Sequence, residues 1–159
     1  MSSRPPVLDP AQRELLAGAR RATLATVAPD GRPRLVPVCF VLGAGEDAVG
    51  RARLYTPLDE KPKRSDDPRD LARVRDLLVL PQATLLVDRW SEDWTELAWL
   101  RLYATGELLE PEPRELDEHA AAVSALRAKY AQYAAHALET RPLIRLSINR
   151  IVAWGDPGP

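Results

Sequence analysis

The sequence predicts a mainly β protein with inserted helices, an α+β fold built on a six-stranded antiparallel barrel. Three observations predict this class: six short runs of β-forming residues, tight turns between neighbouring runs, and helical patterns that do not alternate strictly with the strands. A doubly wound sheet would need that alternation. With 159 residues, the chain is expected to form one domain over 1–159, with flexible tails at 1–9 and 155–159.

Turn and cap residues place the elements of the first half. Asp9 and Pro10 are typical of an N-cap and a first helical turn. The pair Asp30-Gly31 is a strong turn signal between two β-type runs, so it predicts a hairpin. Pro37 cannot donate to a ladder, which indicates a sheet edge or a bulge. The glycine-rich segment 43–50 predicts a loop.

Periodicity places the remaining elements. An aspartate at 66 or 67 is expected to cap the second helix, with these side chains inward: Leu71, Val74, Leu77 and Leu78. The longest helix has an apolar stripe of Leu116, Ala120, Val123, Leu126, Tyr130 and Tyr133. The last strand is expected to place on one face Ile144, Leu146, Ile148, Val152 and Trp154. In chain order, the expected elements are a helix over 10–18, strands over 22–28, 34–42 and 53–57, a helix over 68–79, strands over 83–88 and 97–105, a helix from Pro113, and a strand over 143–154.

Composition excludes several classes of protein. Lys and Arg number 22 against 23 Asp and Glu, so the net charge of -1 argues against a general nucleic-acid binder. Cys39 is the single cysteine, which excludes an intrachain disulfide, and no Cys/His cluster has the spacing of a metal site. There is no apolar run of membrane-spanning length and no signal-peptide pattern, so a cytoplasmic location is expected. The heavy use of Ala, Leu, Pro and Arg indicates a GC-rich bacterial genome.

One basic turn is a candidate phosphate site. The strand over 53–57 runs into a segment that carries Lys61, Lys63 and Arg64. Each charge-assisted hydrogen bond contributes about 1.5–3 kcal/mol, so two or three of them suffice to anchor a phosphate. The alternative is a solvated loop, because acidic residues lie among these cations.

Several motifs resemble those of the pyridoxamine 5'-phosphate oxidase-like split β-barrel family. They are RLVPVCF (34–40), LYTP (54–57), the lysine-bearing turn, LLVD (85–88) and WLRL (99–102). The narrower motifs resemble the coenzyme F420-dependent branch, found mostly in actinobacteria: DEKPKR (59–64), DRWSEDW (88–94) with AWLR (98–101), and RIVAW (150–154). The resemblance covers about residues 10–154.

The resemblance implies a homodimer of split barrels of the FMN-binding type, with a flavin or deazaflavin at the subunit interface. The phosphate contacts would be Lys61, Lys63 and Arg64, and the strand-end pair near the ribityl phosphate would be Tyr55 and Thr56. The strand whose backbone lines the ring would be Arg34, Leu35, Val36, Pro37 and Val38. From the second subunit, the ring would be covered by Trp99 and Arg101, or by Trp154.

The sequence departs from the family pattern at one point. The family has a Lys three residues before an Asn-Leu or Asn-Ile pair, whereas here Arg73 stands three residues before Asp76-Leu77. The phosphate ligand is therefore either the basic turn or Arg73, and the acidic Asp76 replaces a neutral amide. His119 and His136 are expected to be solvated and Cys39 to be a small buried hydrophobe, so no catalytic side chain is assigned.

The resemblance and the basic turn together predict an oxidoreductase that binds coenzyme F420 and transfers hydride to a small unsaturated or quinone-like acceptor. One alternative is an FMN-dependent oxidase or reductase of the same fold. Another is a non-catalytic protein that binds a flavin, a deazaflavin or a haem-like ligand. Pyridoxamine phosphate oxidation is less favoured because RIVAW (150–154) lacks the Arg-Leu-x-Pro continuation of those oxidases.

Overall fold

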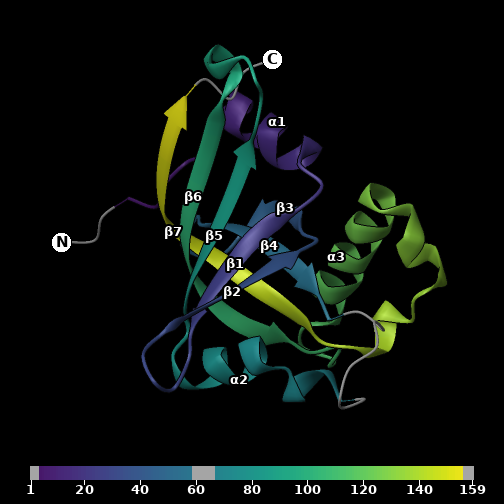
Figure 1. The fold of residues 1–159 in the computed structure, drawn as a ribbon. Coiled ribbons are helices and arrows are strands. Elements are labelled where there is room, and N and C mark those ends of the chain that lie inside the picture. Colours follow the sequence, from purple (N-terminus) through teal and green to yellow (C-terminus); the bar gives the residue numbers. More distant parts are fainter. Residues whose placement is uncertain (1–3, 59–66, 156–159) are drawn as a thin grey trace.

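The computed structural model describes residues 4–58 and 67–155. Its centre is an antiparallel sheet with the strand order β2-β1-β5-β6-β7-β4-β3 (Figure 1). The mainly β, α+β class is confirmed, although the sheet has seven strands where six were predicted. The strands are β1 (Ala22–Val27), β2 (Pro33–Val38), β3 (Val41–Glu46), β4 (Ala52–Pro57), β5 (Gln82–Arg89), β6 (Ala98–Leu109) and β7 (Leu143–Gly155).

Helices pack against both ends of this sheet and against one side of it. The helix predicted over 10–18 is confirmed, and Asp9 caps it by accepting a hydrogen bond from the N–H of Gln12 at 2.8 Å. Asp67 caps a short 3-10 turn, and the helix after it starts only beyond Leu71. The helical elements are α1 (Pro10–Gly18), η1 (Pro68–Asp70), α2 (Ala72–Val79), η2 (Trp94–Glu96), α3 (Leu116–Lys129), η3 (Ala131–Ala135) and η4 (Leu138–Thr140).

The additional strand comes from the segment that was predicted to be a loop. The chain leaves β2 at Val38 and enters β3 at Val41, and these two strands lie at opposite ends of the sheet order. Gly43 belongs to β3, where an added Cβ would lie 2.8 Å from the Tyr55 ring. This glycine therefore permits a close approach between two strands, so the loop prediction was wrong.

The break between β2 and β3 brings the two ends of the sheet together without a closed ladder. The break consists of Cys39 and Phe40, and Phe40 is fully buried. The hydroxyl of Tyr130 accepts a hydrogen bond from the Phe40 N–H at 3.1 Å. The same hydroxyl lies 3.1 Å from the carbonyl oxygens of Phe40 and Arg20, either of which accepts its proton. A side chain thus satisfies the backbone at the break.

The core lies inside the curled sheet, between α1 and α2. Leu15 and Leu16 enter it from α1, while Val74 and Leu77 enter it from α2. Leu78 was predicted to point inward, but this prediction was wrong: it is 65% exposed, whereas its neighbour Leu77 is buried. Leu8, within the segment expected to be a tail, is buried in this core. β2 pairs only with β1, so the edge position indicated by Pro37 is confirmed.

A bulge in β7 reverses its alternation. Tyr103 of β6 pairs with Arg150, but the next residue, Ala104, pairs with Ile148, which leaves Asn149 as the extra residue. Beyond this point the side chains of β7 exchange faces. Val152 and Trp154 therefore do not share the core face of Ile148, as the uninterrupted alternation predicted.

α3 covers β3, β4 and the adjoining ends of β6 and β7 with a second apolar cluster. The helix begins at Leu116, three residues later than predicted, and Leu116 is half exposed. His119 was expected to be solvated, yet it is buried and its Nε2 lies 2.7 Å from the carbonyl oxygen of Arg141. The members of the cluster are Val41, Tyr55, Leu109, Ala122, Val123, Leu126, Tyr130, Tyr133, Leu138 and Leu143.

The remaining outer surface of the sheet is not covered in the part of the chain that the structure describes. In Figure 1, α2 lies at the foot of the sheet and α3 at its right, while no helix crosses the front of β1, β5, β6 and β7. No described helix combines the length and the apolar character needed to cross a membrane.

We expect Tyr130→Phe to lower the free energy of unfolding by about 1–3 kcal/mol, because it leaves buried backbone groups of Phe40 without a partner. Urea denaturation would measure the change. Tyr103→Phe is the matched control, since the Tyr103 ring lies on the uncovered side of β6. Equal stabilities of the two variants would contradict the role assigned to the Tyr130 hydroxyl.

Candidate functional site

The uncovered surface is here called the outer face. Strand alternation and register bring onto it two of the residues of β2 that the resemblance assigns to a ring, together with all three proposed covering residues. Leu35 is 64% exposed there and Trp154 is 53% exposed. The outer face consists of Thr23, Ala25, Leu35, Pro37, Thr84, Leu86, Asp88, Trp99, Arg101, Tyr103, Arg150, Val152 and Trp154.

Two arginines lie over aromatic rings on the outer face. The Arg101 guanidinium is 5.3 Å from the centroid of Trp99 and 5.6 Å from that of Tyr103. The Arg150 guanidinium lies 5.5 Å from the centroid of the same Tyr103 ring. Trp99 also pairs directly with Trp154 across β6 and β7. Stacking of this kind holds the cations in place, so they can meet an anionic group without first being ordered.

The free edge of β2, which β1 and β5 separate from these side chains, offers a backbone donor. At the hairpin turn, the Ala28 N–H donates to the carbonyl oxygen of Arg32 at 2.9 Å. Ala28 and Arg32 are therefore a hydrogen-bonded pair of the antiparallel ladder. Because bonded pairs recur at every second residue, Leu35 turns its N–H and C=O away from β1. The neighbours turned the same way are Pro33 and Pro37, which have no N–H. Leu35 therefore supplies the one N–H that β2 directs to its free edge.

Arg34 faces a different space, a cavity between the β1–β2 hairpin and α2. Its Nε donates to Oδ2 of Asp76 at 2.7 Å, and the Thr26 hydroxyl donates to the same oxygen at 2.8 Å. The Asp76 carboxylate thereby fixes the orientation of the Arg34 guanidinium through the hydrogen bond to Nε. The cavity has a volume of about 500 Å³ and is lined by Val27, Ala28, Pro29, Gly31, Arg34, Ala72, Arg75, Asp76, Val79 and Leu80.

The acidic Asp76, at which the sequence departs from the family pattern, thus has a partner. Burial by itself would raise the pKa of Asp76, but the hydrogen bonds from Arg34 and Thr26 outweigh it and hold that pKa below its ordinary value. The carboxylate is therefore charged near neutral pH. Its charge partly offsets the two arginines that line the cavity, Arg34 and Arg75.

The structure does not bring the other predicted cofactor residues onto the outer face. The Tyr55 hydroxyl donates to Oε1 of Glu118 at 2.8 Å beneath α3, and burial together with Glu118 raises the pKa of Tyr55 to about 12. Thr56 is fully buried, and within the described residues its hydroxyl has no hydrogen-bond partner. Arg73 lies in the first turn of α2. The predicted phosphate ligands Lys61, Lys63 and Arg64 fall outside the described residues.

Sequence reasoning missed Tyr103 and Arg150 on the outer face. Tyr103 could have been found, because it continues the alternation of Trp99 and Arg101 along one strand. Arg150 could not, because the bulge at Asn149 decides which face it takes. Over residues 4–58 and 67–155, no group of three or more His, Cys, Asp or Glu side chains is placed to hold a metal ion.

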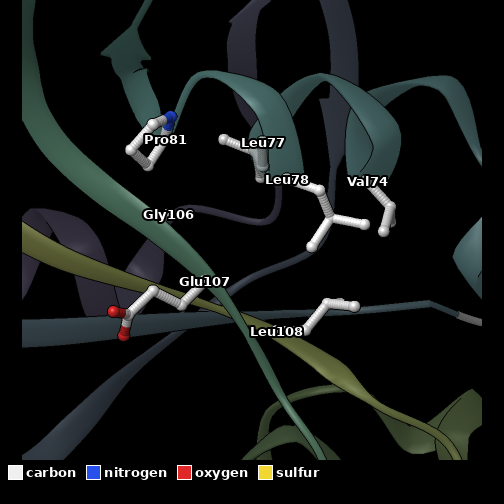
Figure 2. A pocket seen from close by; sticks show the side chains of 7 residues that line it. All are labelled: Val74, Leu77, Leu78, Pro81, Gly106, Glu107 and Leu108. Carbon is white, nitrogen blue, oxygen red and sulfur yellow. The ribbon is translucent and has the colours of Figure 1, made fainter.

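A second cavity, of about 310 Å³, lies between α2 and β6 (Figure 2). An added Cβ at Gly106 would lie 2.8 Å from a methyl group of Leu77, so this glycine allows α2 to approach β6. The carboxylate of Glu107 points away from the leucine side chains in Figure 2 and accepts a hydrogen bond from Arg145 at 2.8 Å. Among the described residues that line this apolar space, no side chain therefore offers a free polar group with which to orient a ligand.

The chain belongs to the pyridoxamine 5'-phosphate oxidase family, whose model matches residues 8–155. A search of the curated protein sequences finds no match. Among solved structures, the chain is similar to Rv2991 of Mycobacterium tuberculosis, with 16% identity and a TM-score of 0.67 over 98% of this chain and 89% of that one.

Two further similar structures are those of haem proteins. HutZ, the haem storage protein of Vibrio cholerae, has 16% identity and a TM-score of 0.62 over 93% of this chain and 94% of its own. A haem-binding protein of Mycobacterium smegmatis has 21% identity and a TM-score of 0.61 over 96% of this chain and 57% of its own. At such identities the likeness shows the fold.

We expect Asp76→Asn to lower the free energy of unfolding by about 1 kcal/mol at pH 7, because a charge-assisted hydrogen bond to Arg34 is lost. A carboxyl with a lowered folded-state pKa stabilises the fold above its ordinary pKa of about 3.9, and that stability is lost as the pH falls. The difference between variant and wild type should therefore shrink in acid.

Urea denaturation at several pH values would measure this difference. Asp30→Asn is the control, because Asp30 lies in the same hairpin and its ion pair with Arg32 is exposed on both sides. A difference from wild type that stays constant down to pH 3 would contradict the assignment to Asp76.

Proposed function

We propose that this protein is an oxidoreductase that binds coenzyme F420 and transfers hydride between the deazaflavin and a small unsaturated or quinone-like acceptor. The observation that carries the proposal is the outer face, where an open strand edge, exposed apolar side chains and two stacked arginines lie together. The motifs that resemble the F420-dependent branch support the choice of cofactor.

The residues of the outer face fit a planar, polar ring system. Leu35 and Pro37 offer a flat apolar surface, and the N–H of Leu35 is directed to the strand edge, where a ring oxygen or nitrogen can accept it. The Arg101 guanidinium, held over the Trp99 and Tyr103 rings, offers a positive charge to an anionic ring or substrate. The bound cofactor supplies the hydride chemistry, while these groups bind and orient it.

The phosphate of the cofactor is assigned to the basic turn after β4. Lys61, Lys63 and Arg64 would provide three cations there, and Arg34 on β2 carries a guanidinium that Asp76 orients. Arg73 is the other candidate on α2. Two or three charge-assisted hydrogen bonds are enough to hold a phosphate at micromolar strength.

We also propose that the protein is a homodimer that packs through its outer faces. Monomers rarely leave several large apolar side chains of one sheet face in water, and the outer face exposes Leu35, Leu86 and Trp154. In a two-fold dimer, Trp99, Arg101 and Trp154 of one copy can cover the ring held by β2 of the other. The acceptor would then enter between the two subunits.

Two alternatives are set against F420. FMN shares the ribityl phosphate, so the same residues would hold it. Haem is the second alternative, because HutZ and the Mycobacterium smegmatis protein have a similar fold and their names describe haem storage and haem binding. Haem iron takes His, Cys, Met or Tyr as its protein ligand, and among the described residues of the outer face only Tyr103 qualifies.

The test is an absorbance spectrum of the purified protein, followed by titration with oxidised F420, FMN and haemin. We expect colourless protein that quenches F420 fluorescence at micromolar concentration and binds FMN at least about tenfold more weakly. A yellow protein, or a preference for FMN, would transfer the proposal to the flavin branch. A Soret band with no deazaflavin binding would contradict it.

Replacing Lys61 and Lys63 together with alanine should weaken F420 binding about tenfold or more, because charge-assisted hydrogen bonds to the phosphate are lost. Fluorescence titration would measure the dissociation constant. Arg73→Ala is the companion variant, since it tests the other candidate phosphate ligand. Unchanged affinity in the double variant would remove the basic turn from the site.

Leu86→Asp should dissociate the dimer, because it places a charge at the centre of the outer face. Sedimentation velocity would show the protein shifting from the mass of two chains to that of one. Leu116→Asp is the control, since Leu116 is half exposed on α3, away from the outer face. A variant that remains as dimeric as wild type would contradict an interface on this face.

A further inference from the structure

The turn between β5 and β6 carries the two most exposed tryptophans of the described chain. Trp90 is 69% exposed and Trp94 is 73% exposed. Hydrogen bonds within the turn hold it in one conformation: the Ser91 hydroxyl donates to Oε2 of Glu96 at 2.9 Å, and the Thr95 N–H donates to Asp93 at 3.0 Å. A pre-ordered segment with exposed indoles loses little entropy when a partner covers it.

This turn is also strongly acidic. One positive charge, on Arg89, stands against four carboxylates in the segment 88–96. Glu92 is exposed, and no hydrogen bond to a described residue engages its carboxylate. A partner for this surface must therefore combine apolar area with positive charge. The acidic residues are Asp88, Glu92, Asp93 and Glu96.

A cavity at the opposite end of the sheet has the complementary character. The cavity between the β1–β2 hairpin and α2 contains Arg34 and Arg75, of which Arg75 is exposed and its guanidinium makes no hydrogen bond with a described residue. Its apolar wall includes Val79, which is 82% exposed, and Leu80, which is 38% exposed. A volume of about 500 Å³ is sufficient for an indole ring.

The two surfaces lie at opposite ends of the same sheet. In Figure 1 the turn after β5 is at the top, whereas the β1–β2 hairpin and α2 are at the bottom. When two copies meet through their outer faces, the two-fold axis lies in the plane of contact, and its two limiting directions are along the strands and across them. An axis along the strands would bring the two acidic turns together. An axis across the strands would bring each acidic turn to the arginines of the other copy.

We propose that the axis runs across the strands and that the turn of each copy docks into the cavity of its partner. Trp94 would then pack on Val79 and Leu80, with Glu92 facing Arg75. This inference rests on the homodimer of the proposed function and adds to it the direction of the axis and a contact. It also places an indole of the second copy beside Arg34, at the start of the ring-binding strand.

A charge exchange tests the contact. Glu92→Arg and Arg75→Glu should each weaken dimerisation about tenfold, because every symmetric dimer contains the contact twice. The double variant should return the dimer dissociation constant to within about threefold of wild type. Glu112→Arg is the control, an equally exposed charge reversal outside both surfaces. Sedimentation velocity in low salt is the measurement.

Cysteine cross-linking tests the direction of the axis. Glu92→Cys combined with Val79→Cys should give a cross-linked dimer on mild oxidation, whereas each single variant should not. Efficient cross-linking of Glu92→Cys alone would mean that the acidic turns meet, which would overturn the proposal. Wild type and its native Cys39 provide the background lane.

The outcomes separate this inference from the proposed cofactor. A monomeric wild type overturns the docking contact, whatever ligand the protein binds. Dimerisation through other surfaces, with no effect of either charge reversal, overturns it as well. Rescue by the double variant in a protein that binds neither F420 nor FMN supports the contact and rejects the proposed function.

Discussion

The hydrogen bonds of the Tyr130 hydroxyl hold together the place where the sheet breaks. Between β2 and β3 the chain leaves one ladder and joins the other, and Phe40 at the break is fully buried. An unpaired backbone group at such depth costs as much as a lost hydrogen bond. Because Tyr130 follows directly on α3, the same contact ties that helix to the sheet and keeps β2 as an open edge.

The unequal covering of the sheet follows from this arrangement. α3 packs on the outer side of β3 and β4, where Tyr55 reaches Glu118, and it leaves the rest of the outer surface open. That open surface holds Trp99, Arg101 and Tyr103 in a stacked row on β6, on the same face as Leu35 and Pro37 of the edge strand β2. The proposed cofactor and the proposed partner copy both use that face.

Local signals in the sequence predicted much of the fold. Asp9 and Pro10 placed α1, and Asp30-Gly31 placed the β1–β2 hairpin, because caps and tight turns depend on nearby residues. Gly43 was misread, since a glycine that admits a neighbouring ring resembles a loop glycine in sequence. The basic turn that the sequence offers as a phosphate site lies outside the described residues, so that part of the site remains a prediction.

By itself, the sequence determined the fold class, most of the elements, the edge character of β2 and the alternation that joins Trp99 to Arg101. Tertiary structure alone decided which of these residues meet. The bulge at Asn149 turns Arg150 and Trp154 to the outer face, and the fold brings Asp76 to Arg34 across 42 residues of chain. The physical reason is that strand alternation and capping act over a few residues, whereas register and pairing depend on how distant segments pack together.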